Sequence, residues 1–176
     1  MSKLAFYSKS RDYAAGAGPQ EYIVDISQSN FTELNSIKDW RKILSNFHVY
    51  PFKYTNGYTY NSIEHVFQAM KIALADPEKA LLFTVESGDE IGIGDGAIAQ
   101  KNRRLVKLDK NQIAHWDEIK ADVMRTAAEC KYEQCEAAQK VLKATHNAEL
   151  WHIVSRSAPV RFEHLEKIRE NLGTNL

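Results

Sequence analysis

The clearest pattern of apolar and polar positions along the chain lies between residues 61 and 74. Asn61 or Ser62 is suited to cap a helix there, and Asn61 with Glu64 matches a capping box. Glu64, Gln68 and Lys71 are spaced by four and three residues, which stacks them along one polar face. Apolar side chains form the opposite stripe at helical spacing: Ile63, Val66, Phe67, Met70 and Leu74.

Shorter patterns predict strands on both sides of a glycine-rich loop near the N-terminus. Residues 3–8 and 22–26 are expected to form short strands. Two further short segments, 51–54 and 58–60, flank an Asn-Gly pair, and this predicts a β-hairpin because both turn residues tolerate positive φ.

Helical spacing recurs through most of the remaining chain. Residues 28–46 mix turn and helix signals, with one or two helical turns near 39–44, and residues 150–154 fit a strand or a helical turn. The sequence therefore favours a helix-rich α+β fold with a small antiparallel sheet. Further helices are expected at 76–85, 97–104, 116–131, 133–144 and 160–172.

Length and charge narrow the class of protein. A chain of 176 residues with 44% hydrophobic residues predicts a single domain spanning 1–176. Its 23 basic and 23 acidic residues balance, which argues against binding long nucleic acid through bulk charge. A nucleotide-sized ligand, free or within nucleic acid, remains compatible with this balance.

Cysteine and histidine spacing indicates neither a disulfide framework nor a metal site. Cys130 and Cys135 are the two cysteines and lie five residues apart in a stretch with helical spacing, and no histidine pair has a metal-ligand spacing. No apolar run approaches the roughly 18 residues that cross a bilayer. We expect a cytoplasmic protein that contacts no membrane and needs no cofactor or metal.

Two weaker patterns have simple structural explanations. Gly92, Gly94 and Gly96 invite comparison with a phosphate-binding loop, but no clear strand precedes them and no Gly-Lys-Ser/Thr ending follows. The polar face of the helix at 61–74 could simply be solvated, with Glu64 acting as a cap. Residue physics alone favours that explanation.

A family resemblance favours a functional role for this polar face over simple solvation. The segments Leu44-Ser-Asn-Phe47, Pro51-Phe52 and Gly57 to Lys71, which contains Ser62-Ile-Glu-His65 and Gln68-Ala-Met-Lys71, closely resemble the signature of the NADAR (YbiA-like) family. Phe6-Tyr-Ser8 and Lys131-Tyr-Glu-Gln134 match further family positions. The resemblance covers essentially residues 4–172, with an apparent insertion at about 17–43.

Membership of this family implies a YbiA-like fold and an N-glycosidase that cleaves a ribosyl C–N bond of an ADP-ribosylated base of the guanine type, or of a related ribosylamine nucleotide. Glycosidases of the family usually carry Asn-Asp-x-x-Trp-Gly near the C-terminus. This chain has Asn147-Ala-Glu-Leu-Trp151-His152 there instead. That departure keeps two alternatives open: a non-catalytic binder of NAD, ADP-ribose or a cyclic derivative, and a structural protein on an enzyme scaffold.

The chemistry that the resemblance implies assigns roles to particular residues. Glu64 would stabilise an oxocarbenium-like transition state or activate water. Lys131 or Lys71 would handle the proton of the leaving group, or attack the opened sugar as an amine. We expect Glu64, Lys71, Trp116 and Lys131 to line one concave pocket. The substrate-binding candidates are Trp116 and Tyr60 for stacking, Arg103, Arg104, Arg156 and Arg161 for phosphate, and Phe47, Gln68 and His152.

Overall fold

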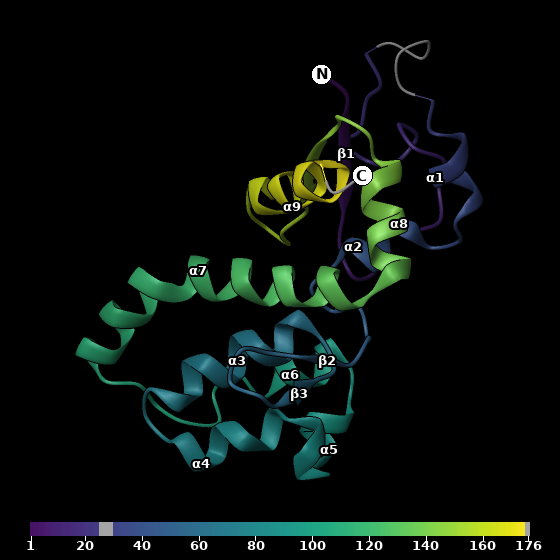
Figure 1. Cartoon of the computed structure of the whole chain (residues 1–176). Helices are drawn as coiled ribbons and strands as arrows, with labels where there is room; N and C mark the ends of the chain where they lie inside the picture. The colour runs from purple at the N-terminus through teal and green to yellow at the C-terminus, as the bar shows by residue number, and fades with distance from the viewer. Residues whose placement is uncertain (25–29, 175–176) are drawn as a thin grey trace. The chain divides into compact units, whose positions relative to one another are not determined.

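The computed structural model describes residues 1–24 and 30–174 (Figure 1). It divides into two compact units, which we describe separately. Unit 1 comprises Met1–Ser45 and Glu136–Leu176, and unit 2 comprises Asn46–Cys135. Helices dominate both units and each has a small sheet, so the helix-rich α+β fold expected from the sequence is confirmed.

The sheet of unit 1 has three strands in the order β1-β4-β5. β1 (Lys3–Phe6) pairs in parallel with β4 (Glu149–His152), and β5 (Val160–Arg161) pairs antiparallel with β4. The purely antiparallel sheet expected from the sequence is therefore corrected for the β1–β4 pair. A parallel pair needs a long crossover connection, and such pairing leaves no local signal in the sequence.

The second strand expected near the N-terminus is reduced to one bridge. Tyr22 pairs with Lys3 across an isolated antiparallel bridge, with hydrogen bonds of 2.9 and 3.1 Å in the two directions. Residues 23 and 24 form no strand, and residues 25 and 26 of the expected strand lie outside the described residues.

The helices that the described residues of unit 1 form beside the sheet are α1 (Thr32–Ser36), α2 (Trp40–Leu44), α8 (Glu136–Ala144) and α9 (Glu163–Thr174). α8 packs against α2 and α9, and α9 packs against β4. The helix expected from residue 160 begins instead at Glu163, because residues 160 and 161 pair with β4. The unit's core includes the fully buried side chains Leu4, Phe6, Leu34, Leu142 and Leu165.

Unit 2 opens with the predicted hairpin. β2 (Phe52–Lys53) pairs antiparallel with β3 (Thr59–Tyr60), so the hairpin is confirmed, with shorter strands than expected. Gly57 adopts φ +86° in the turn, a conformation that glycine reaches at little cost. Asn56 accepts the backbone N–H of Tyr58 at 3.1 Å, which stabilises the turn.

The helices of unit 2 are α3 (Ile63–Ala73), α4 (Pro77–Ala80), α5 (Glu90–Ile93), α6 (Gly96–Lys101) and α7 (Lys110–Gln134), with 3₁₀ turns at Leu81–Phe83 and Val85–Ser87. α3 packs along α7 and against α4 and α6, and Figure 1 shows α7 running alongside α3. The α3–α7 pair is the frame of this unit.

Several helix boundaries in unit 2 differ from those expected. The helix expected at 97–104 is α6, which spans Gly96–Lys101, because Asp95 caps its start and residues 102–104 leave the helix. The helix expected at 76–85 is α-helical only to Ala80 and continues as a 3₁₀ turn at Leu81–Phe83. Thr84 interrupts it, because this residue is extended, with ψ 150°, and its hydroxyl caps the next 3₁₀ turn.

α7 begins six residues earlier than the expected residue 116, because Asp109 and Gln112 form a complete capping box. It ends where Cys135 becomes extended, with ψ 96°, and α8 follows.

Close packing explains the glycine cluster at 92–96. A Cβ on Gly92 would lie 2.0 Å from the backbone oxygen of Thr84, and a Cβ on Gly96 would lie 2.5 Å from the Cα of Phe47. Backbone neighbours of this kind cannot move aside. These glycines are therefore needed for packing within unit 2.

We expect Gly92→Ala to destabilise the protein by about 1–3 kcal/mol, the usual cost of overpacking. Thermal unfolding of this variant would measure the loss. Gly173→Ala is the matched control, since a Cβ there meets nothing within 4 Å on helix α9. That control should be neutral or slightly stabilising. Equal effects of the two substitutions would contradict the packing role of Gly92.

Candidate functional site

The side chain of Glu64 does not cap the N-terminus of helix α3. Ser62, not Asn61, is the N-cap: its hydroxyl accepts the backbone N–H of His65 and lies 2.7 Å from the Nδ1 atom of that residue. The expected Asn61–Glu64 capping box is therefore wrong, because Glu64 stands one position too early in the helix to close it. The side chain of Glu64 is available for another role.

Glu64 is the centre of a polar cluster on α3. Gln68, one turn further along, donates from Nε2 to Glu64 Oε1 at 2.7 Å, and the two side chains are 7% and 5% exposed. Burial raises the pKa of Glu64, while Gln68, Lys71 and Arg103 act in the opposite direction. Residue physics alone favours a solvated polar face. That interpretation is wrong for Glu64 and Gln68, because both side chains are buried.

Lys71 extends the cluster toward the end of α6. Its ammonium donates to the backbone oxygen of Arg103 at 3.0 Å. Burial and the neighbouring Arg103 and Arg104 lower its pKa, and Glu64 acts against them. The structure thus brings together Glu64, Gln68, Lys71 and Arg103, of which the sequence spacing related only the first three. A carboxylate and cationic groups share this part of unit 2.

Three buried polar atoms, on α3 and in the segment 46–48, have no hydrogen-bond partner among the described residues. They are Gln68 Oε1, Asn46 Oδ1 and His48 Nδ1. The backbone oxygen of Asn46 accepts the N–H of Glu64 at 3.0 Å, so this turn adjoins the start of α3. Unpaired buried polar atoms are costly and are rare in folded proteins. A ligand bearing N–H or O–H donors would satisfy them.

Sequence reasoning did not select Asn46 or His48 as site residues. Asn46 belongs to the Leu-Ser-Asn-Phe segment that carries the family resemblance, and this membership could have marked it as a site residue. Desolvation, with a contribution from nearby Lys131, lowers the pKa of His48 to about 4. His48 is therefore neutral at physiological pH and can accept a hydrogen bond through one ring nitrogen.

The aromatic candidates of unit 2 occupy different environments. Trp116 on α7 contacts Phe67 on α3 edge to face, with ring centroids 4.8 Å apart. Tyr60 is 1% exposed and its hydroxyl accepts a hydrogen bond from Asn56 at 2.9 Å, so its ring packs in the core. Phe47 lies against Gly96. Of the two residues expected to stack on a base, Trp116 is joined to the Glu64 helix through Phe67.

Lys131 is fully buried on α7, near the Asn46–His48 turn. Burial lowers its pKa to about 7, and Cys135 acts weakly in the opposite direction. Fifteen residues separate it from Trp116 on one helix, a spacing of about 22 Å at 1.5 Å per residue. The sequence predicts one pocket lined by Glu64, Lys71, Trp116 and Lys131, and this stays a prediction. Because of the spacing on α7, such a pocket would have to extend along the α3–α7 pair.

The shifted pKa of Lys131 predicts a pH dependence of stability. The unfolded chain keeps the proton up to about pH 10.5, whereas the native state releases it near 7. The unfolded state therefore binds more protons between these values, and the free energy of unfolding rises with pH by up to about 1.4 kcal/mol per unit. Urea unfolding from pH 7 to 9.5 should show this slope, and Lys131→Met should flatten it.

Lys120→Met is the matched control for this experiment, because Lys120 lies on the same helix with its side chain 48% exposed. It should keep the slope of the parent protein. If Lys131→Met also kept it, the depressed pKa of Lys131 would be wrong.

Three further candidates, His152, Arg156 and Arg161, belong to unit 1. His152 stacks on Phe162, with ring centroids 5.0 Å apart, and burial lowers its pKa. Arg161 forms ion pairs with Glu166 at 2.8 Å and with Glu149 at 3.2 Å. Arg156 is exposed and has φ 61°. Within unit 1, Arg161 already has two carboxylate partners, and the roles of all three residues in substrate binding stay predictions.

The described part of the chain offers neither a cluster of metal ligands nor a membrane-spanning helix. No group of three or more His, Cys, Asp or Glu side chains within residues 1–24 and 30–174 is placed to hold a metal ion. Over the same residues, no helix is long and apolar enough to span a membrane.

Comparison with known proteins assigns the fold and the family. The chain is similar to the solution NMR structure of the E. coli protein YbiA, with a TM-score of 0.59 and 22% sequence identity, over 98% of this chain and 87% of that one. The fold is therefore YbiA-like. No curated protein sequence matches significantly. The model of the NADAR domain matches residues 29–158. The chain belongs to the NADAR family.

Proposed function

We propose that this protein is an N-glycosidase that hydrolyses the ribosyl C–N bond of an ADP-ribosylated base of the guanine type. Membership of the NADAR family supports ADP-ribose-linked substrates. The observation that carries the proposal is the buried carboxylate of Glu64, which is 7% exposed and hydrogen-bonded to Gln68. Among the described residues, this carboxylate has no capping role and no ion pair within 4 Å, and a buried carboxylate of this kind is costly to keep without a function.

The chemistry of the bond matches that carboxylate. As the C–N bond breaks, its electron pair moves to the base nitrogen and positive charge develops at C1 of the ribose. Glu64 would stabilise that charge electrostatically and accept a proton from the water that adds to C1. The base nitrogen gains one proton, and the products are the free base and ADP-ribose. Desolvation raises the pKa of Glu64 and suits it to proton transfer.

Lys131 or Lys71 would supply the proton to the departing base. Burial lowers the pKa of both, and that of Lys131 falls to about 7, where an amine can both hold and give up a proton. The same neutral amine could act as a nucleophile toward the opened sugar. The donor edge of a guanine would suit the unpaired acceptors on Gln68, Asn46 and His48.

Trp116 and the arginines complete the proposed binding site in unit 2. Where Lys71 is the proton donor, Trp116 would stack on the base, an interaction worth about 1–3 kcal/mol. Lys131 lies about 22 Å further along α7 and would not reach a base held on Trp116. Arg103 and Arg104 are exposed beside Lys71 and would bind the phosphates by charge-assisted hydrogen bonds. Nothing in this scheme requires a metal ion.

One observation favours a second candidate, a protein that binds ADP-ribose or a related nucleotide without turnover. The segment at 147–152 departs from the Asp-x-x-Trp-Gly pattern usual in glycosidases of the family. Such a binder would use the same acceptors and cations, and its Glu64 would serve only to hold the ligand.

Incubation with ADP-ribosylated guanosine and, separately, with NAD would distinguish these candidates. Chromatography of the products should show released guanosine and ADP-ribose from the first substrate. If both compounds bind saturably and are recovered intact, the N-glycosidase proposal is wrong and the nucleotide-binding protein takes its place.

A further inference from the structure

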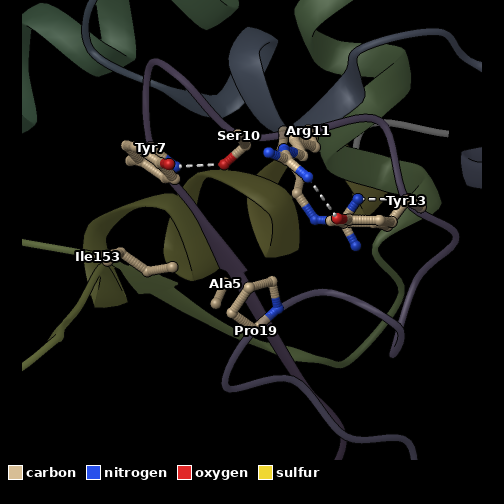
Figure 2. Close-up of a pocket in the computed structure, with 8 residues that line it drawn as sticks. Ala5, Tyr7, Ser10, Arg11, Tyr13, Pro19 and Ile153 are labelled. Atoms are coloured by element: carbon tan, nitrogen blue, oxygen red, sulfur yellow. Dashed lines mark hydrogen bonds between the residues drawn. The ribbon is translucent and has the colours of Figure 1, made fainter.

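Unit 1 contains a pocket of about 240 Å³ to which no function has yet been given. Its lining combines cations, aromatic rings and apolar side chains: Tyr7, Tyr13, Arg11, Arg41, Ser10, and the group Ala5, Pro19 and Ile153. Figure 2 shows Tyr7 and Tyr13 on opposite sides in this view, with Ala5 and Pro19 below them. This volume lies below the about 300–1,000 Å³ typical of drug-sized sites. The pocket therefore suits a small ligand.

A buried ion pair holds one wall of the pocket in place. Arg41 donates two hydrogen bonds to the Glu21 carboxylate, from Nε to Oε1 at 2.9 Å and from Nη2 to Oε2 at 2.6 Å. It also donates to the backbone oxygens of Tyr13 and Ala14. Glu21 accepts three backbone N–H groups as well, from Ala5, Gly16 and Gly18. The loop that carries Tyr13 and Pro19 is thus fixed before any ligand binds, which lowers the entropic cost of binding.

Gly18 is tightly packed against the Glu21–Arg41 ion pair in this wall. A Cβ there would lie 2.8 Å from Glu21 Oε2 and 3.1 Å from Arg41 Nη2. Most of the donors of Arg41 are used within the wall, and Glu21 neutralises its charge. Arg41 therefore shapes the pocket and contributes little net charge to it.

Arg11 is the cation that remains available at the pocket. It is exposed, and its Nη1 donates to the Tyr13 hydroxyl at 3.4 Å, with no carboxylate partner among the described residues. Tyr7 and Tyr13 are 37% and 39% exposed, so their rings are partly open to a ligand. A guanidinium pairs with phosphate or carboxylate oxygens, and tyrosine rings stack on flat aromatic groups.

We propose that this pocket binds a small planar aromatic anion, with its ring between Tyr7 and Tyr13 and its phosphate or carboxylate group on Arg11. The anion would arrive either as a nucleoside monophosphate or as an aromatic carboxylic acid. The inference is independent of the proposed glycosidase, because none of its residues belongs to the Glu64 cluster.

Calorimetric titration with two charged probes and their neutral counterparts tests the proposal and distinguishes the two sources. Adenosine monophosphate is compared with adenosine, and nicotinate with nicotinamide. At least one charged probe should bind saturably, at least tenfold more tightly than its neutral counterpart. Arg11→Gln should remove that tenfold preference. Tyr7→Leu and Tyr13→Leu should weaken the same probe about fivefold or more.

Two further variants control for general charge and for the other candidate site. Lys9→Gln removes an exposed cation from the same loop and should leave the affinity unchanged. Glu64→Gln should also leave it unchanged, even if that variant has lost turnover. The proposal is overturned if no charged probe binds, if Arg11→Gln leaves the preference intact, or if binding is lost in Glu64→Gln but kept in Arg11→Gln.

Discussion

Glu64→Gln should reduce turnover of ADP-ribosylated guanosine by about 10²–10⁴-fold, the range expected for losing a positioned acid–base group. The amide keeps the size of the carboxylate and can still accept the hydrogen bond from Gln68. It loses the negative charge, which the positive transition state needs and the ground-state substrate does not. Binding of the substrate should therefore stay within tenfold, or about 1.4 kcal/mol. Steady-state kinetics beside calorimetric binding would measure both.

Stability separates a catalytic effect of this substitution from a structural one. Burial raises the pKa of Glu64, which means that the ionised form is disfavoured in the native state. Removing that charge should leave the melting temperature equal or higher, and Ser62 still caps the helix. Glu118→Gln, at a site with a 78% exposed side chain in the same unit, is the matched control and should keep full activity. Full turnover in Glu64→Gln would refute the proposed mechanism.

Arg41→Met should lower the free energy of unfolding by about 3–5 kcal/mol, the cost of removing one partner from a buried ion pair. The side chains of Arg41 and Glu21 are 3% and 0% exposed, and the guanidinium also satisfies two backbone oxygens. Without it, the Glu21 carboxylate keeps only backbone donors. For a chain of this length, the melting temperature should fall by about 6–20 °C.

Lys42→Met offers a matched comparison on the next position of α2. Lys42 pairs with Asp39 at 2.8 Å, but these side chains are 44% and 35% exposed. Exposed pairs contribute about 0–1 kcal/mol, so this variant should melt close to the parent protein. Similar losses in the two variants would show that the Arg41–Glu21 pair has no special structural role.

Local sequence signals predicted the elements that depend on neighbours in the chain. The Asn56-Gly57 turn fixed the hairpin, and the spacing of Glu64, Gln68 and Lys71 placed them on one face of α3. Asp76 and Pro77 correctly marked the start of α4 through their cap and first-turn preferences. In each case the information lies within a few residues.

The remaining features depend on contacts between distant parts of each unit. The parallel β1–β4 pair joins residues more than 140 positions apart, and the Glu21–Arg41 pair joins a loop to helix α2 across 20 positions. Choosing Ser62 over Asn61 as the N-cap required the hydrogen bond from the His65 backbone N–H to the Ser62 hydroxyl. In the candidate site, the approach of Arg103 to Lys71 came only from packing of α6 on α3. None of these contacts has a periodic signature.

Hydrolysis of ADP-ribosylated guanosine in H₂¹⁸O, followed by mass spectrometry of the products, tests the proposed function most directly. Water adds to C1 of the ribose in the proposed reaction, so the label should appear in ADP-ribose and not in the released guanosine. ADP-ribose incubated alone in H₂¹⁸O corrects for exchange at the sugar. Labelled base, or the absence of both products from a substrate that binds, would contradict the proposed N-glycosidase.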